Sequence, residues 1–163
     1  MLEEFMGIPV HPLLVHAPVV FVPLLAVLAV AYGFLPFVRP HTRWVVGLLA
    51  VATPIAALLA KLSGDAFFAR LQSRHRVTPA YFPKIEAHRH FGTMTVYATV
   101  ALAVLTLALV YYVAPRVAGH VAGGSRRPLS VVLAVLSLVA AGVSVYYVIR
   151  AGDAGAKLVW TGL

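Results

Sequence analysis

The residues of this sequence best suited to chemistry are histidines that lie near the starts of two apolar stretches. His11 and His16 flank the start of one stretch, and His88 and His90 precede another. Two neutral imidazoles facing each other across a helical bundle can bind the iron of a b-type haem from both sides. The spacing of these histidines therefore raises haem binding as a function to test.

His16 and His88 are the pair that we expect to hold haem b. If the first helix starts at Pro12, His16 lies about one turn inside it and is the deepest histidine. On the other helix, His88 and Gly92 are one turn apart and begin a small, weakly polar stripe, which should face neighbouring helices. Gly92 would leave room there for a flat macrocycle.

Besides haem held by His16 and His88, three readings of the histidines stay open. His11 and His90 are the alternate haem ligands, although His90 leads a stripe typical of ordinary packing. In the second reading the cofactor is a copper, iron or zinc ion, since imidazoles and carboxylates bind such metals. The candidate metal ligands are His11, His16, His88, His90, Asp65 and Asp153. In the third reading the histidines only form hydrogen bonds to helix ends and lipid headgroups.

The elements that position these histidines are helices that cross a lipid bilayer. The 163-residue chain is 61% hydrophobic and only 11% charged, which is far too apolar for a soluble domain. Four apolar segments are long enough to span a hydrocarbon core, at residues 13–38, 44–62, 91–113 and 129–148. The sequence therefore predicts an all-α, integral membrane four-helix bundle that forms one domain over residues 1–163.

The predicted topology gathers most histidines at one membrane face. The N-terminus, the connection between the second and third helices, and the C-terminus share this face, which we call the histidine side. We expect residues 39–43 to form the turn between the first two helices. A short amphipathic helix over residues 66–74 should lie on the membrane surface on the histidine side. His41 and His120 fall on the opposite side.

Charge and composition narrow the location and the partners. The net charge of +8 comes from short basic segments between apolar runs, which are typical of topology signals rather than nucleic-acid binding. The side opposite the histidines has basic, acid-free short loops, so we expect the histidine side and both termini to face outward from a bacterial inner membrane. The chain has no cysteine, which excludes a covalently attached c-type haem.

A weak internal repeat suggests two related helical hairpins. Gly64-Asp65-Ala66 follows the second helix, and Gly152-Asp153-Ala154 follows the fourth. In each half, two histidines also lie around the start of the first helix. Two hairpins related by an axis along the membrane normal would explain both features. Such symmetry would place a histidine of the first helix opposite one of the third.

The opening residues carry a recognisable motif. Residues 11–18 read His-Pro-Leu-Leu-Val-His-Ala-Pro, which fits the pattern HPxxVHxP, and Gly64-Asp65 and Gly155 recur further along. The chain thereby resembles a bacterial four-helix membrane family of unknown function that is similar in architecture to membrane b-type cytochromes. Some members of that family are fused to Rieske or cytochrome c domains. The resemblance implies membrane electron transfer, although Ala156 departs from the family pattern.

The leading prediction is therefore a b-type cytochrome-like protein that passes electrons at one membrane face. Its partners would be the lipid bilayer and a quinone or a respiratory redox complex. The alternatives are a metal-binding membrane protein and a non-catalytic accessory subunit of a larger complex. No hydrolytic constellation stands out, and the oligomeric state stays open.

Overall fold

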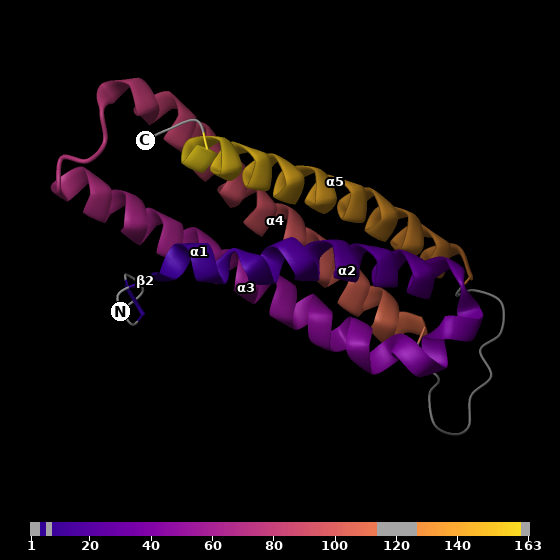
Figure 1. Ribbon diagram of the computed structural model, residues 1–163. Helices are drawn as coiled ribbons and strands as arrows, with labels where there is room; N and C mark the ends of the chain where they lie inside the picture. The colour runs from indigo at the N-terminus through magenta and orange to yellow at the C-terminus, as the bar shows by residue number, and fades with distance from the viewer. Residues whose placement is uncertain (1–3, 6–7, 114–126, 161–163) are drawn as a thin grey trace.

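The protein is a bundle of four long antiparallel helices (Figure 1). The computed structural model describes residues 4–5, 8–113 and 127–160. The helices are α2 (His16–Phe34), α3 (Arg39–Ser73), α4 (Phe82–Val113) and α5 (Arg127–Trp160). Around the bundle, α2 packs against α3 and α5, and α4 packs against the same two helices. The predicted all-α membrane bundle is confirmed.

Short elements complete the described chain. The strands β1 (Glu4–Phe5) and β2 (Ile8–Pro9) form a small antiparallel pair. The helix α1 (Val10–Leu14) leads into α2. These two helices form one candidate membrane span. The break between them at Val15 is explained by Pro18, which lacks the N–H that would bond to the carbonyl of Leu14. The 3-10 helices η1 (Pro36–Val38) and η2 (Pro79–Tyr81) precede α3 and α4.

The helices α3, α4 and α5 are longer than their apolar segments predict, whereas the first span runs from Val10 to Phe34 rather than over the predicted residues 13–38. With a rise of about 1.5 Å per residue, the 35 residues of α3 extend well beyond a hydrocarbon core of about 30 Å. The expected surface helix over residues 66–74 was wrong, because α3 continues without interruption to Ser73. The expected turn over residues 39–43 was also wrong, because α3 already begins at Arg39.

The turn between α2 and α3 is held by Arg39. Its guanidinium donates from Nε to the carbonyl oxygen of Tyr32 and from Nη2 to that of Gly33, at 2.8 Å each. These carbonyls end α2 and have no partner within the helix. The chain therefore turns at residues 35–38, immediately before the residues 39–43 at which the sequence pattern predicted the turn.

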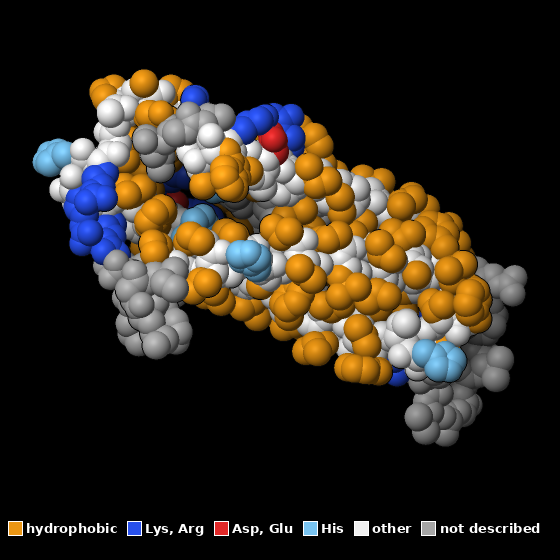
Figure 2. Space-filling model, in the orientation of Figure 1, with side chains coloured by type: hydrophobic (Ala, Val, Ile, Leu, Met, Phe, Trp, Pro, Cys, Tyr) orange, Lys and Arg blue, Asp and Glu red, His pale blue; other side chains and the backbone are white. Residues whose placement is uncertain are grey.

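The surface of the bundle matches a lipid environment. Hydrophobic side chains cover its length, and most charged side chains lie toward the ends (Figure 2). Each of the four spans is long and apolar enough to cross a membrane. Both termini and the connection between α3 and α4 lie at one end, as predicted for the histidine side (Figure 1).

The burial pattern supports two related hairpins, one formed by α1, α2 and α3 and the other by α4 and α5. Each buried residue of α2 corresponds to a buried residue of α4 at the spacing that separates His11 from His88. The buried α2 residues Pro18, Val22, Leu25, Ala26, Ala29 and Tyr32 match Thr95, Thr99, Leu102, Ala103, Thr106 and Leu109. In the second helices of the hairpins, Val46, Ala50, Thr53 and Ala57 match Ser137, Ala141, Ser144 and Val148.

This correspondence corrects the register of the repeat. It aligns Gly64 with Gly155, whereas the sequence match had aligned Gly64 with Gly152. The corrected register also aligns Ala60 with Ala151, and both residues contact a histidine in the same way.

Candidate functional site

His11 is part of α1, and its side chain contacts residues 60–64 of α3. Its Nδ1 is 3.0 Å from the carbonyl oxygen of Ala60 and 3.2 Å from Oγ of Ser63. A carbonyl oxygen can only accept, so Nδ1 carries the proton. The ring also packs directly on Gly64, where a Cβ atom would come within 2.8 Å of Cε1. Glycine is therefore needed at position 64 for the imidazole to reach α3.

His88 repeats this arrangement in the second hairpin. Its Nδ1 is 2.9 Å from the carbonyl oxygen of Ala151, so it also donates to the backbone of the neighbouring helix. A Cβ atom at Gly155 would lie 2.9 Å from Cε1 of His88. In both hairpins, the histidine rests on a glycine and donates to the carbonyl one turn before that glycine.

The two equivalent histidines meet between the two hairpins, toward the histidine-side end of the bundle. The ring centroids of His11 and His88 are 6.0 Å apart, and the ring planes are inclined by 75°. Phe67 stacks on His11 at 6.4 Å, with an angle of 20° between the rings. The structure thus brings together His88 and the alternate ligand His11.

The predicted facing pair of His16 and His88 was wrong in its first member. His16 is exposed, and its Nδ1 lies 3.3 Å from the carbonyl oxygen of Leu13 in the preceding turn. His90 is also exposed and contacts Phe91 at 5.8 Å between ring centroids. The helical pattern does not start at Pro12, as assumed, but at Val10, and His11 is turned toward α3.

One side of the histidine pair is closed by an ionic bridge between α3 and α4. Asp65 pairs with Lys61 on its own helix and accepts from Nε of Arg89 at 3.1 Å. Nη1 of Arg89 also donates to Glu86 at 3.0 Å. The side chains of Asp65 and Lys61 are each 29% exposed. This bridge joins the two hairpins directly beside His11.

The symmetric position, between α1 and α5, has no such bridge. In the corrected register, Lys61, Asp65 and Arg89 correspond to Gly152, Ala156 and Pro12, all three of which are exposed. A Cβ atom at Gly152 would meet no atom within 4 Å, and the same holds for Gly92. Figure 2 shows a hollow near the histidine side in which histidine, acidic and basic side chains are visible. The pseudosymmetry is therefore broken in a way that leaves this side open.

The candidate carboxylate ligands are engaged elsewhere. Asp65 is held in the bridge, and Asp153 accepts from Nζ of Lys157 at 2.7 Å. Over the parts of the chain that the structure describes, no group of three or more histidine and carboxylate side chains is placed to hold a metal ion. The predicted six-residue metal set is therefore not assembled there. His120 lies outside the described residues.

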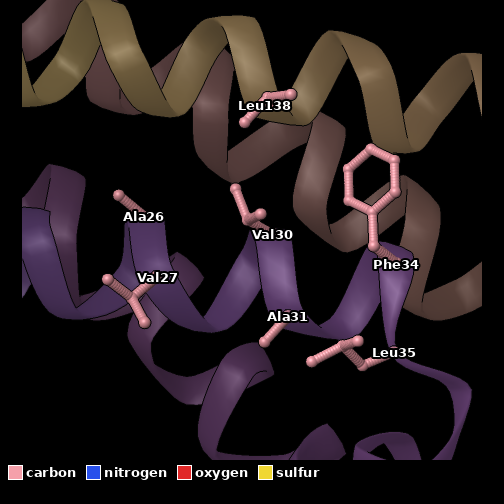
Figure 3. A pocket seen from close by; sticks show the side chains of 7 residues that line it. All are labelled: Ala26, Val27, Val30, Ala31, Phe34, Leu35 and Leu138. Atoms are coloured by element: carbon pink, nitrogen blue, oxygen red, sulfur yellow. The ribbon is translucent and has the colours of Figure 1, made fainter.

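A separate groove on the bundle surface is entirely apolar. It encloses about 600 Å³ between α2 and α5 and lies away from the histidines (Figure 3). Its walls carry no titratable group, so it offers contacts only to apolar molecules such as lipid tails. The lining residues are Ala26, Val27, Val30, Ala31, Phe34, Leu35 and Leu138.

The residues that hold the histidines were not identified from the sequence. Ala60 and Gly64 are four apart, as are Ala151 and Gly155. Two small residues at this spacing allow close approach between membrane helices. This pattern, aligned between the hairpins, would have pointed to both histidine-bearing contacts.

The chain belongs to a family described as "Predicted membrane protein (DUF2231)", whose sequence model matches residues 7–162. This membership confirms the resemblance to a membrane-protein family of unknown function. Comparison with curated proteins and with solved structures gives no match.

Proposed function

We propose that this family member is a membrane electron-transfer protein of the b-type cytochrome kind, in which His11 and His88 would hold one haem. The observation that carries the proposal is the shared geometry of the two imidazoles. Each donates from Nδ1 to a backbone carbonyl of the neighbouring helix, and the two rings lie 6.0 Å apart.

The hydrogen bonds select the tautomer that metal binding requires. With the proton fixed on Nδ1, a neutral imidazole presents the lone pair of Nε2. Histidines that bind metals almost always donate their other ring N–H to a carbonyl, a carboxylate or water, which fixes the ring orientation. His11 meets this condition within the first hairpin and His88 within the second.

The separation of the rings fits one metal ion between them. With metal–nitrogen bonds of about 2.0–2.1 Å, one ion could be held by both imidazoles at this separation. Two protein ligands suffice for haem because the porphyrin supplies the other four. A zinc site needs three or four protein ligands, and the described residues assemble no such set. The ligand count therefore favours haem over an ion held by the protein alone.

The surroundings offer a flat macrocycle an approach to the pair. The side between α1 and α5 lacks the ionic bridge that closes the opposite side, and Gly92 and Gly152 face open space. A bound haem supplies one-electron redox chemistry, with a potential set by its axial ligands and its burial. His11 and His88 would bind and orient the iron, while Ser63 and the two carbonyls hold the imidazoles in place.

The wider assignment follows the same proposal. We place the protein in a bacterial inner membrane with the histidine side outward, because the opposite loops are short, basic and free of acids. Electrons would pass between this face and a quinone or a respiratory complex.

A purely structural role of the histidines is the competing explanation. The same hydrogen bonds join α1 to α3 and α4 to α5, and such polar contacts stabilise membrane helix pairs by about 0.6–2 kcal/mol. An accessory subunit without a cofactor would need nothing more than this.

The reduced-minus-oxidised absorption spectrum of the purified protein, supplied with haem during expression, separates these possibilities. We expect a b-type band in the wild type and in His16→Ala, and its loss in His11→Ala and His88→Ala. All variants must be purified as folded protein, checked by circular dichroism. A folded wild-type protein with no haem band, or a band that survives both His11→Ala and His88→Ala, would refute the proposal.

A further inference from the structure

The residues in and beside the connection between α3 and α4 carry positive charge that nearby carboxylates do not balance. Within the described residues, Asp65, Glu86 and Asp153 are already taken up in ion pairs with Lys61, Arg89 and Lys157. These pairs leave three cations in and beside the connection without a carboxylate partner in the described structure: Arg74 and Arg76, which follow α3, and Lys84, in the first turn of α4. Figure 2 shows basic side chains grouped at this end of the molecule. We call these three residues the basic turn.

The backbone holds the basic turn in a defined shape. The N–H of His75 bonds to the carbonyl of Gln72 at 3.0 Å, and that of Arg76 bonds to the carbonyl of Leu71 at 3.0 Å. His75 has φ of 51°, a left-handed conformation that usually favours glycine. Arg74 and Arg76 therefore project from a fixed helix terminus, and both are exposed.

Arg74 and Arg76 lie well beyond the apolar part of α3. Asp65 and Lys61 are the charged residues at which the apolar part of α3 ends on this side. From Asp65 to Ser73 the helix rises about 12 Å, whereas each interfacial layer of a bilayer is roughly 5–8 Å deep. For a helix that runs along the membrane normal, this rise exceeds the depth of the headgroup layer, so Arg74 and Arg76 would reach water. Their position suits contact with a soluble molecule better than contact with a lipid phosphate.

The basic turn is also connected to the histidine pair by one continuous helix. Gly64, which supports His11, and Arg74 are about 15 Å apart along α3. A partner bound at the turn would therefore stand close to the proposed haem. Positive surfaces of this kind steer acidic proteins into contact and raise their association rates by about 10–1000-fold.

We propose that the basic turn is the docking surface for the acidic face of a soluble electron-transfer protein or domain. The electron-transfer role of the partner rests on the proposed function, whereas docking itself requires only the charges of Arg74, Arg76 and Lys84. The contact is weak and salt-dependent, because exposed charges are screened within about 10 Å at 0.1 M salt.

The experiment measures association of an acidic ferredoxin with the full-length protein in nanodiscs of uncharged phosphatidylcholine. The test variant carries Arg74→Glu, Arg76→Glu and Lys84→Glu, and a basic cytochrome c serves as the probe of opposite charge. Arg43→Glu is the control, since Arg43 is exposed at the other end of the bundle. We expect the triple variant to slow ferredoxin association by about 10-fold or more at low salt. Salt at 0.5 M should remove most of the difference, and Arg43→Glu should have no effect.

Binding is read without any redox signal, so its outcome is independent of haem. Association that survives in a haem-free preparation and falls in the triple variant supports docking even if the proposed function fails. Equal ferredoxin association by the wild type and the folded triple variant would overturn the docking proposal. It would equally be overturned if ferredoxin failed to bind and the basic turn instead strengthened binding to anionic vesicles.

Discussion

Gly64 and Gly155 set how closely the two imidazoles approach α3 and α5, so one added methyl group at either position should displace a ring. A Cβ atom would lie 2.8 Å from Cε1 of His11 in Gly64→Ala and 2.9 Å from Cε1 of His88 in Gly155→Ala. Real Cβ atoms essentially never approach other atoms within 3.0 Å. Because each ring is the end of a side chain, it can swing away and leave the helices in place.

The expected cost combines three effects. Loss of the Nδ1 hydrogen bond removes about 0.5–1.5 kcal/mol, and overpacking adds about 1–3 kcal/mol. Alanine favours a helix over glycine by about 0.8–1.0 kcal/mol, which offsets part of this cost. We therefore expect each variant to be less stable by a net ~0.5–4 kcal/mol. Residues that orient metal ligands typically change metal affinity by about 10–100-fold, so haem affinity should fall in that range.

Thermal unfolding in detergent and an equilibrium haem titration measure the two effects. Gly47→Ala on α3 and Gly142→Ala on α5 are matched controls, because a Cβ atom at either position meets no atom within 4 Å. The controls should be at least as stable as the wild type and bind haem equally well. The reasoning fails if Gly64→Ala and Gly155→Ala match these controls in both stability and haem affinity.

Three further substitutions test separate parts of the structure. Asp65→Asn should lower stability by about 1–3 kcal/mol, because charged hydrogen bonds between α3 and α4 are lost, while the exposed Asp153→Asn should change it by less than about 0.5 kcal/mol; equal effects in chemical denaturation would contradict this. His75→Gly should raise the unfolding temperature, since glycine relieves about 1 kcal/mol of left-handed strain, and a lower temperature would count against it. Thr106→Val should be neutral or stabilising because its buried hydroxyl lacks a partner, whereas Thr99→Val should destabilise by about 1 kcal/mol because two carbonyl contacts are lost; the reverse order would refute the assignment.

Hydropathy predicts the four membrane helices well because lipid forces every spanning backbone segment to bond internally. It predicts their ends poorly. The apolar signal of α3 stops near Leu62, but the helix continues to Ser73 through Asp65 and Arg70. Charged side chains do not end a helix once it leaves the membrane, so composition marks where the lipid stops rather than where the helix stops.

The candidate site was predictable only in part, for a related reason. His88 does lie beside another histidine, but that histidine is His11, and the choice of His16 rested on its depth along the helix. The direction of a side chain depends on the register between neighbouring helices, which is set by Ala60 and Gly64 packing close to α1. The sequence shows these small residues but does not show which partner they face. The corrected alignment of Gly64 with Gly155 needed the burial pattern of both hairpins.

The central proposal is that His11 and His88 would together hold one haem. The electron paramagnetic resonance spectrum of the oxidised, haem-loaded protein measures this coordination directly. The account predicts a low-spin signal of six-coordinate iron in the wild type and in His16→Ala. His11→Ala and His88→Ala should each convert the iron to a high-spin form or lose the haem. A low-spin signal that persists unchanged in either of these two variants would contradict the assignment.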